Sequence, residues 1–201
     1  MSQSNDEHSD ATDNFTNHDA QLAALDINAT ESIDDETLDT FYHRDNLLTI
    51  MMATLDFIDA RMQQGLTLPY FEDIDPEIWQ TKLKALDIYI TDEIEGRALN
   101  LEARDKDYAT NILSYPSDLP TAVIELMPTL LLGELIICHD VMVREAEEQN
   151  KTVAQHISHL LIHGVLHLLG FDHELGQAEQ YEMEDFEIRI LAGLNLPNPY
   201  L

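Results

Sequence analysis

Apolar and polar residues alternate most clearly between Leu86 and Ile90. Leu86, Ile88 and Ile90 are apolar, and Asp87 and Tyr89 lie between them. This period of two predicts a strand with one buried face. Three other short segments are expected to form strands, at residues 47–54, 111–115 and 133–138. The first of these runs is continuously apolar, a pattern that is also compatible with a helix.

Five helices are expected from their start signals and their apolar spacing. They begin near Pro76, after Asp92 (reaching about Arg104), at His139 (to Asn150), after Thr152 (to Gly170) and at Gln177 (to about Leu194). The run of acids on the last helix is interpreted as a solvent-exposed face, and residues 119–128 as a loop. Without repeats or regular alternation of strands and helices, the pattern predicts one α+β domain with a small, mostly four-stranded mixed sheet.

Residues 1–42 differ in composition from the rest of the chain. They are rich in Ser, Asn, Thr and Asp, and such a segment buries too little apolar surface to order itself. We therefore expect an acidic disordered extension over residues 1–42 and the folded domain over residues 43–201.

The chain carries no recognisable targeting or membrane signal. Its first ten residues are polar and acidic, and its richest apolar region, residues 124–138, is interrupted and too short to span a membrane. The single cysteine, Cys138, fits a reducing compartment. These features predict a soluble, cytoplasmic protein with no membrane partner.

The formal net charge of -29 argues at first against a nucleic-acid ligand, because phosphates are repelled by an acidic surface. Residues 1–43, however, hold 11 of the 39 acidic residues and no lysine or arginine. Exposed charges more than about 8 Å apart are largely screened at cellular salt, so a local basic patch can attract phosphates despite the negative net charge of the whole chain. Five of the ten basic residues could form one: Lys82, Lys84, Arg97, Arg104 and Lys106.

Three histidines at the end of the helix that begins after Thr152 have the spacing of metal ligands. His163 and His167 are four residues apart, so a helix places them on one face. Gly170 can take positive φ and reverse the chain, which can return His173 to the same point. Imidazole nitrogens suit zinc, and three protein ligands leave a fourth position for water. We expect one zinc ion per chain, carried by a central helix.

The same helix contains two further histidines. His159 lies about 12 Å along the helix axis from His167, too far to share an ion with it. We interpret His156 and His159 as supporting, substrate-facing or exposed residues. A helix that is merely rich in histidine is the simplest alternative, but this one is apolar nearly all round, and buried imidazoles need partners.

The histidine spacing is that of the long zinc-peptidase motif, which gives the site zincin-like geometry. In that motif a glutamate follows the first histidine and acts as general base. Gly164 occupies this position, and only 28 residues follow His173. A metallopeptidase is therefore the second hypothesis. It would become the first if a carboxylate from elsewhere in the chain, such as that of Glu134, lay over the metal and could act as the general base.

Several segments resemble the YbeY family of bacterial ribosomal-RNA maturation factors, which are metal-dependent single-strand endoribonucleases. The match covers roughly residues 47–201 and is loosest between residues 60 and 84. Besides the histidine motif, it includes Leu99-Asn100, Arg104-Asp105-Lys106-Asp107, Thr110-Asn111-Ile112-Leu113-Ser114 and Leu132-Gly133-Glu134-Leu135-Ile136-Ile137.

The resemblance implies a zinc site at His163, His167 and His173 and a functional Arg104 near the scissile phosphate. Guanidinium groups pair well with phosphate oxygens, although Arg104 could instead form a surface ion pair with Asp105 or Asp107. The implied substrate is single-stranded ribosomal RNA, cleaved by zinc-activated water. The implied roles are processing of the small-subunit RNA 3′ end and ribosome quality control, with the small ribosomal subunit as partner.

The chain departs from the family pattern at three positions. Asp105 replaces a usual glycine, Ala109 a usual proline and Tyr115 a common phenylalanine. A third hypothesis is a non-catalytic, ribosome-associated protein with structural zinc, which normally has four protein ligands. Asp172 is the only neighbouring candidate for a fourth ligand, and we interpret it as a supporting partner of His173.

Overall fold

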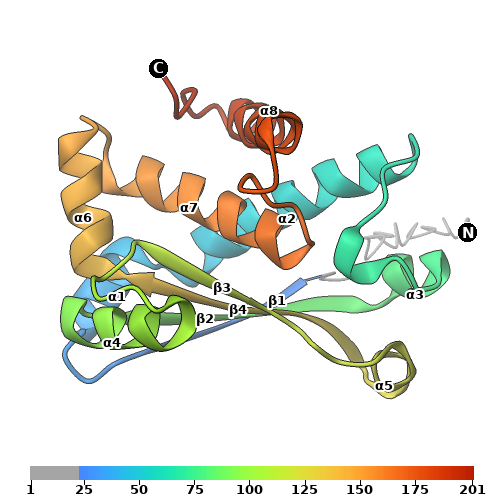
Figure 1. The fold of residues 1–201 in the computed structure, drawn as a ribbon, viewed down its shortest axis with the longest axis horizontal. Coiled ribbons are helices and arrows are strands. Elements are labelled where there is room, and N and C mark those ends of the chain that lie inside the picture. The colour runs from blue at the N-terminus through green and yellow to red at the C-terminus, as the bar shows by residue number, and fades with distance from the viewer. Residues whose placement is uncertain (1–22) are drawn as a thin grey trace, which may run out of the picture.

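The four strands of the sheet lie in the order β1-β2-β4-β3 (Figure 1). The computed structural model describes residues 23–201. β1 is parallel to β2 and β2 to β4, whereas β3 is antiparallel to β4, so the sheet is mixed, as predicted. The strands are β1 Ala23–Ala29, β2 Leu83–Thr91, β3 Ile112–Pro116 and β4 Thr129–Cys138.

Helix α7 is the central helix of the domain. It contacts β3 and β4 of the sheet and also α2, α6 and α8, and α2, α7 and α8 lie on the same side of the sheet (Figure 1). The helices are α1 Asp35–Phe41, α2 Arg44–Met62, the 3-10 helix η1 Pro69–Phe71, α3 Pro76–Thr81, α4 Glu93–Arg104, α5 Thr121–Leu126, α6 His139–Glu148, α7 Val153–Leu168 and α8 Gln177–Gly193. The predicted α+β class and single domain are confirmed.

The predicted boundary of the N-terminal extension is wrong, because residues 23–42 are part of the fold. Strand β1 pairs with β2 from Ala23 opposite Lys84 to Ala29 opposite Ile90, and α1 follows it. The polar composition of the whole segment hid a local alternation in which Ala23 and Leu25 are buried and Asp26 is exposed. Pairing with β2 supplies the hydrogen bonds and buried surface that the segment lacks alone. Residues 1–22 lie outside the described part of the chain, so for them the extension stays a prediction.

The strand predicted at residues 47–54 is instead part of α2. Its buried residues follow helical spacing: Leu47, Ile50, Met51, Thr54, Leu55 and Ile58. The apolar run was too short to reveal this period, which becomes clear only over the full helix. Residues 121–126, predicted as a loop, form α5. With α1, α2 and α5 added, the described chain has eight α-helices rather than about five.

The helix starts predicted from capping residues are confirmed. The Asp92 side chain accepts a hydrogen bond from the Glu95 backbone N–H, 2.8 Å away, at the start of α4. Thr152 and Gln155 form a reciprocal capping box at the start of α7. These caps satisfy backbone donors that the first helical turn leaves free, and they set where α4 and α7 begin.

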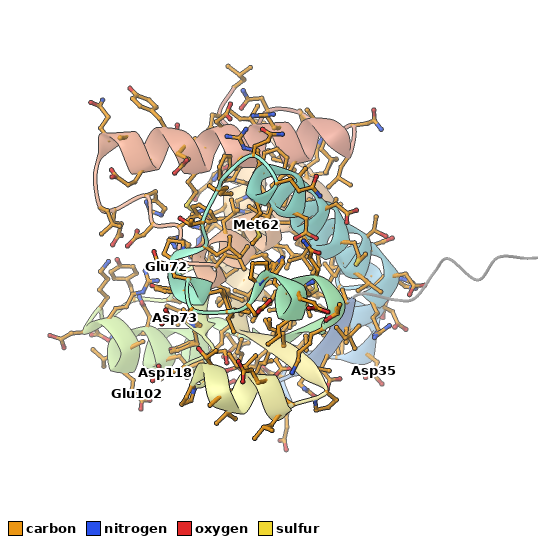
Figure 2. The ribbon with its side chains drawn as sticks, turned by 90° about the vertical axis from the view of Figure 1, so that its right-hand side faces the viewer. Asp35, Met62, Glu72, Asp73, Glu102 and Asp118 are labelled. Atoms are coloured by element: carbon orange, nitrogen blue, oxygen red, sulfur yellow. The ribbon has the colours of Figure 1, made fainter. Side chains whose placement is uncertain are left out.

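The acidic composition is visible on the surface. Exposed carboxylates extend outward from several elements, including Glu72, Asp73, Glu102 and Asp118 (Figure 2). Within residues 23–201, no helix is both long and apolar enough to cross a membrane.

Candidate metal centre

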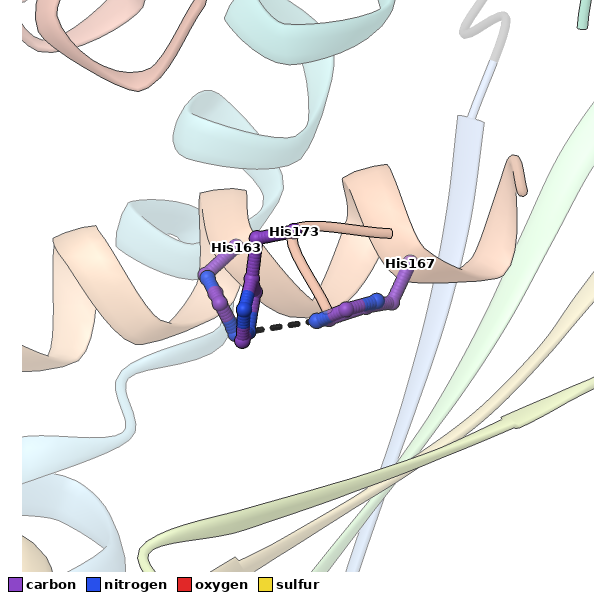
Figure 3. Close-up of side chains that lie close together, drawn as sticks. All are labelled: His163, His167 and His173. Carbon is purple, nitrogen blue, oxygen red and sulfur yellow. Dashed lines mark hydrogen bonds between the residues drawn. The ribbon is translucent and has the colours of Figure 1, made fainter. Parts of the chain in front are cut away.

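Three imidazole rings converge at the C-terminal end of α7. His163 and His167 come from successive turns of the helix, and their Nε2 atoms are 3.1 Å apart (Figure 3). The His173 ring lies 5.1 Å from each of these two rings, measured between centroids. One ligand nitrogen from each ring falls within 4.8 Å of the others, close enough to hold a metal ion. The structure thus brings together the three residues singled out by their spacing.

The turn after α7 returns His173 to the helix. Gly170 has φ +99°, a left-handed conformation that glycine adopts without strain. The Phe171 N–H donates to the Leu166 carbonyl, 3.1 Å away, which closes the turn. A β-carbon on Gly170 would also lie only 2.8 Å from the Pro69 Cβ of η1. The glycine therefore provides both the reversal and the close approach of η1.

The protonation state of His167 suits metal binding. Burial, together with the neighbouring His163 and His173, lowers the pKa of His167 from 6.5 to about 4. At neutral pH this imidazole is uncharged and keeps a nitrogen lone pair. Neutral imidazoles are common zinc ligands, and other divalent metals accept the same donors.

Glu187 of α8 orients the first histidine of the cluster. Its carboxylate is 1% exposed and accepts hydrogen bonds from His163 Nδ1 at 2.8 Å and His159 Nε2 at 3.0 Å. The Tyr200 hydroxyl also donates to it. With Nδ1 of His163 engaged in this way, its Nε2 lone pair faces the other two rings. A carboxylate behind a ligand histidine is a usual feature of metal sites and fixes ring orientation.

The charge on Glu187 is stabilised by its partners. Burial alone would raise the pKa of this carboxyl, but hydrogen bonds from His159 and His163 outweigh it and lower the pKa to about 2. The sequence pattern did not reveal this residue, because the acids of this helix were interpreted as a solvent-exposed face. Glu187 in fact lies within the apolar stripe of α8, with Met183, Phe186, Ile190 and Leu191. A carboxylate at a buried position of that stripe was the available signal.

The two remaining histidines of α7 lie outside the ligand cluster and bond to carboxylates. His159 bonds to Glu187, as described above. His156 is buried, and its Nε2 lies 3.0 Å from Glu145 Oε2 of α6. The same carboxylate oxygen accepts from Asn111 Nδ2 at 2.8 Å, so this contact joins α6, α7 and the start of β3.

A polar cavity of about 410 Å³ opens in front of the histidine cluster. Its walls come from α4, β3, η1, the end of α7 and the loop after it. The lining residues are Tyr70, Arg104, Lys106, Thr110, Asn111, Ile112, Ser114, Pro116, His163, His167, Asp172, His173 and Glu174. The predicted functional arginine therefore shares one cavity with the three histidines.

The predicted five-residue basic patch is wrong, because three of its members are engaged elsewhere. Lys84 is buried against the Trp79 ring, and its ammonium donates to the Trp79 carbonyl. Lys82 donates to backbone carbonyls at the end of α5, and Arg97 forms a two-pronged ion pair with Asp107 at 2.7 and 2.8 Å. Arg104 and Lys106 remain at the cavity.

Arg104 is available to a ligand. The predicted alternative, an ion pair with Asp105 or Asp107, is not formed: Arg97 holds Asp107, and Arg104 pairs with no acid among residues 23–201. Arg104 is the last residue of α4 and is exposed. Among residues 23–201, neither Arg104 nor Lys106 forms an ion pair, so two cations face the same space as the histidines.

The chain is similar in sequence to known proteins. The family model described as endoribonuclease YbeY matches residues 52–195. The chain belongs to the YbeY endoribonuclease family. A protein from Psychrobacter arcticus named endoribonuclease YbeY is 71% identical over 205 residues, covering 100% of both chains. One of the same name from Psychrobacter cryohalolentis is 78% identical over 154 residues, covering 77% of this chain and 99% of the relative.

A more distant likeness is found among solved structures. The solution structure of TM1509 from Thermotoga maritima is 17% identical and has a TM-score of 0.46. The aligned region covers 86% of this chain and 92% of the TM1509 chain. Membership of the YbeY family rests on the sequence matches.

The structure explains one departure of this chain from the YbeY pattern. Asp105 stands where a glycine is usual, and it caps the C-terminus of α4 in the left-handed conformation, with φ 56°. Glycine favours this conformation, and aspartate is among the few other residues that tolerate it. The substitution keeps the turn and places a carboxylate next to Arg104.

The position that holds the general base in zinc peptidases has a different role here. Gly164 is buried against the sheet, and a β-carbon there would lie 2.7 Å from Leu135 Cδ2 and 2.9 Å from Ile112 Cδ1. A glutamate would place its carboxylate in this apolar contact. Glu134 does not replace it: Leu135 faces α7, so the preceding residue of β4 faces the opposite side of the sheet.

A fourth protein ligand is not part of the cluster. Among residues 23–201, the group that could hold a metal consists of the three histidines. Asp172 lines the cavity, but its Oδ1 accepts from the Glu174 backbone N–H at 2.8 Å. Three ligands next to an open cavity are typical of catalytic metal sites, whereas structural zinc is normally enclosed by four.

Proposed function

We propose that the protein is a zinc-dependent endoribonuclease that hydrolyses phosphodiester bonds in single-stranded RNA. The observation that carries this proposal is the shared cavity, in which three converging histidines face the same space as two unpaired cations. Membership of the YbeY family supports the same conclusion. Its substrate is proposed to be ribosomal RNA in the cytoplasm, with roles in 3′-end processing of the small-subunit RNA and in ribosome quality control.

Different residues of the site would bind the metal and the RNA phosphates. His163, His167 and His173 would hold one zinc ion, which when bound supplies Lewis acidity and activates water. Glu187 keeps His163 oriented with its Nε2 toward the cluster. Arg104 would bind the non-bridging oxygens of the scissile phosphate and stabilise the charge that develops on them. Lys106 adds a second cation for a neighbouring phosphate.

The test compares zinc content and cleavage of single-stranded RNA in three variants. His167→Ala should lose both zinc and cleavage, because it removes a ligand. Arg104→Ala should keep its zinc and lose cleavage by about 100-fold or more, as expected for loss of a group that stabilises transition-state charge. Arg144→Ala is the matched control, since Arg144 is half-exposed, pairs with Glu93 and does not line the cavity.

The expected pattern separates metal binding from catalysis. Zinc lost from His167→Ala while cleavage stays unchanged would overturn the proposal. So would equal cleavage by Arg104→Ala and Arg144→Ala. A ribosome-associated protein with structural zinc would lose the metal in His167→Ala but show no cleavage in the wild type.

A further inference from the structure

One aromatic ring at the metal cavity is left uncovered by the fold. Tyr70 is 57% exposed and lines the same cavity as His163, His167 and Arg104. Of the large exposed apolar side chains within residues 23–201, Tyr70 is the only one that lines this cavity. Aromatic rings usually gain stability by packing. An exposed ring that lines a candidate active site therefore offers a ligand an apolar face to pack against.

The backbone of Tyr70 is anchored although its ring is largely exposed. Leu68 and Phe71 of the same segment are buried, and the Phe71 ring packs against Trp79 with centroids 5.6 Å apart. The Tyr70 N–H donates to the Leu169 carbonyl at the end of α7, at 3.4 Å. Helix η1 is thereby tied to the turn that carries His173.

The missing side chain of Gly170 completes this anchoring. A β-carbon on Gly170 would lie 2.9 Å from Tyr70 N and 3.1 Å from Tyr70 Cγ. The turn that carries His173 and the base of the Tyr70 ring are therefore in contact. The ring therefore extends from an anchored point of the backbone, beside the turn that carries His173.

We propose that Tyr70 is a substrate-specificity residue that stacks on an unpaired base next to the scissile phosphate. This inference rests on the proposed function and deepens it. Every base offers a flat face to an aromatic ring, so stacking tolerates many sequences. It requires a base that is splayed out, which a single strand supplies and a duplex does not. Tyr70 would thus select unpaired RNA while Arg104 and Lys106 bind its phosphates.

The test measures KM and kcat of the zinc-loaded protein on a short single-stranded RNA. Tyr70→Ala should raise KM by about 10-fold or more, the range expected for one stacked base, and should keep its zinc. Tyr70→Phe keeps the ring and should remain close to the wild type. Tyr181→Ala is the matched control, because Tyr181 is 61% exposed on α8 and outside the cavity.

A second substrate makes the test specific for stacking. The same RNA is synthesised with an abasic nucleotide on one side or the other of the cleaved bond. One of these substrates should be bound poorly by the wild type and equally poorly by Tyr70→Ala, because the stacking partner is already missing. A loss in Tyr70→Ala that is the same on intact and abasic RNA would overturn the inference, as would unchanged KM on intact RNA.

The two proposals fail in different ways. If the wild type does not cleave single-stranded RNA, the proposed function is wrong. If the wild type cleaves it and Tyr70→Ala does so with the same KM, the function stands and only the role of Tyr70 is wrong. Equal cleavage of duplex and single-stranded RNA by the wild type also contradicts the role of Tyr70.

Discussion

The carboxylate of Glu187 connects His159 and His163 of α7 with Tyr200 near the end of the chain. The Lys151 ammonium donates to the carbonyl of Pro199, the residue before Tyr200, and so holds the C-terminal segment in place. The orientation of one proposed ligand therefore depends on α8 and on the C-terminal segment. Residues far apart in the sequence act on the same imidazole ring.

Replacing Glu187 by glutamine should weaken metal binding without removing a ligand. The amide has nearly the same shape but no charge to stabilise the His163 N–H, and outer partners of ligand histidines commonly contribute 10–100-fold in metal affinity. We expect Glu187→Gln to lower zinc affinity within that range, measured by competition with a chromogenic chelator. Glu182→Gln, at an exposed acid of the same helix, is the control. Equal affinities in the two variants would contradict the role of Glu187.

At this scale the sequence predicted the residues that local spacing could reveal. The three histidines and Arg104 lie within short motifs, and the structure brings them to one cavity. Glu187 and Tyr200 could not be assigned to the site in the same way, because their contacts depend on how α8 packs against α7. Long-range packing also removed Lys82, Lys84 and Arg97 from the predicted basic patch.

Helix α7 packs closely on the sheet at Gly164, where a β-carbon would press on the side-chain ends of Leu135 and Ile112. Gly164 faces Leu135 and Ile112, which are both buried. This contact sets the height of the helix above the sheet. It also sets where His163 and His167 of the same helix enter the cavity.

Gly164→Ala should lower the free energy of unfolding by up to about 2 kcal/mol, because overpacking a core usually costs about 1–3 kcal/mol and higher helix propensity offsets up to about 1 kcal/mol of that cost. The measurement is urea denaturation of the metal-free protein. Gly193→Ala in α8 is the matched control, because a β-carbon there meets nothing within 4 Å. That change should instead stabilise the protein by up to about 1 kcal/mol, through higher helix propensity. A stability loss in Gly193→Ala that matches Gly164→Ala would contradict the packing argument.

At the scale of elements, prediction succeeded where a segment carries its own signal. Caps and apolar stripes gave α3, α4, α6, α7 and α8, and alternation gave β2. The two main errors have a common physical origin. Strand β1 is stabilised by its partner β2, and α2 is distinguished from a strand only over a length greater than its apolar run.

The whole molecule combines a strongly acidic body with a small cationic site. The net charge is -29, and exposed acids such as Glu72, Glu102 and Asp118 extend from the fold in the view of Figure 2. Because only Arg104 and Lys106 of the predicted basic patch line the cavity, few phosphates can be neutralised. RNA binding should therefore depend more on specific contacts than on general electrostatic attraction.

This arrangement predicts a shallow salt dependence. Each neutralised phosphate of a single strand contributes a slope of about -0.7 to a plot of log affinity against log salt, so two contacts give roughly -1.4. Lys106→Ala should reduce the steepness by about 0.7 units. Fluorescence anisotropy of a labelled RNA at several salt concentrations provides the measurement. A slope near -3.5, which five phosphate contacts would give, would contradict the reduced cationic site.

The dependence of RNA cleavage on the metal tests the central claim most directly. The protein is stripped with a chelator, dialysed, and assayed on single-stranded RNA before and after adding one equivalent of zinc. We expect no cleavage by the stripped protein and recovery with one zinc ion, whereas His167→Ala should not recover. Cleavage by the stripped wild type at the rate of the zinc-loaded protein would contradict the account.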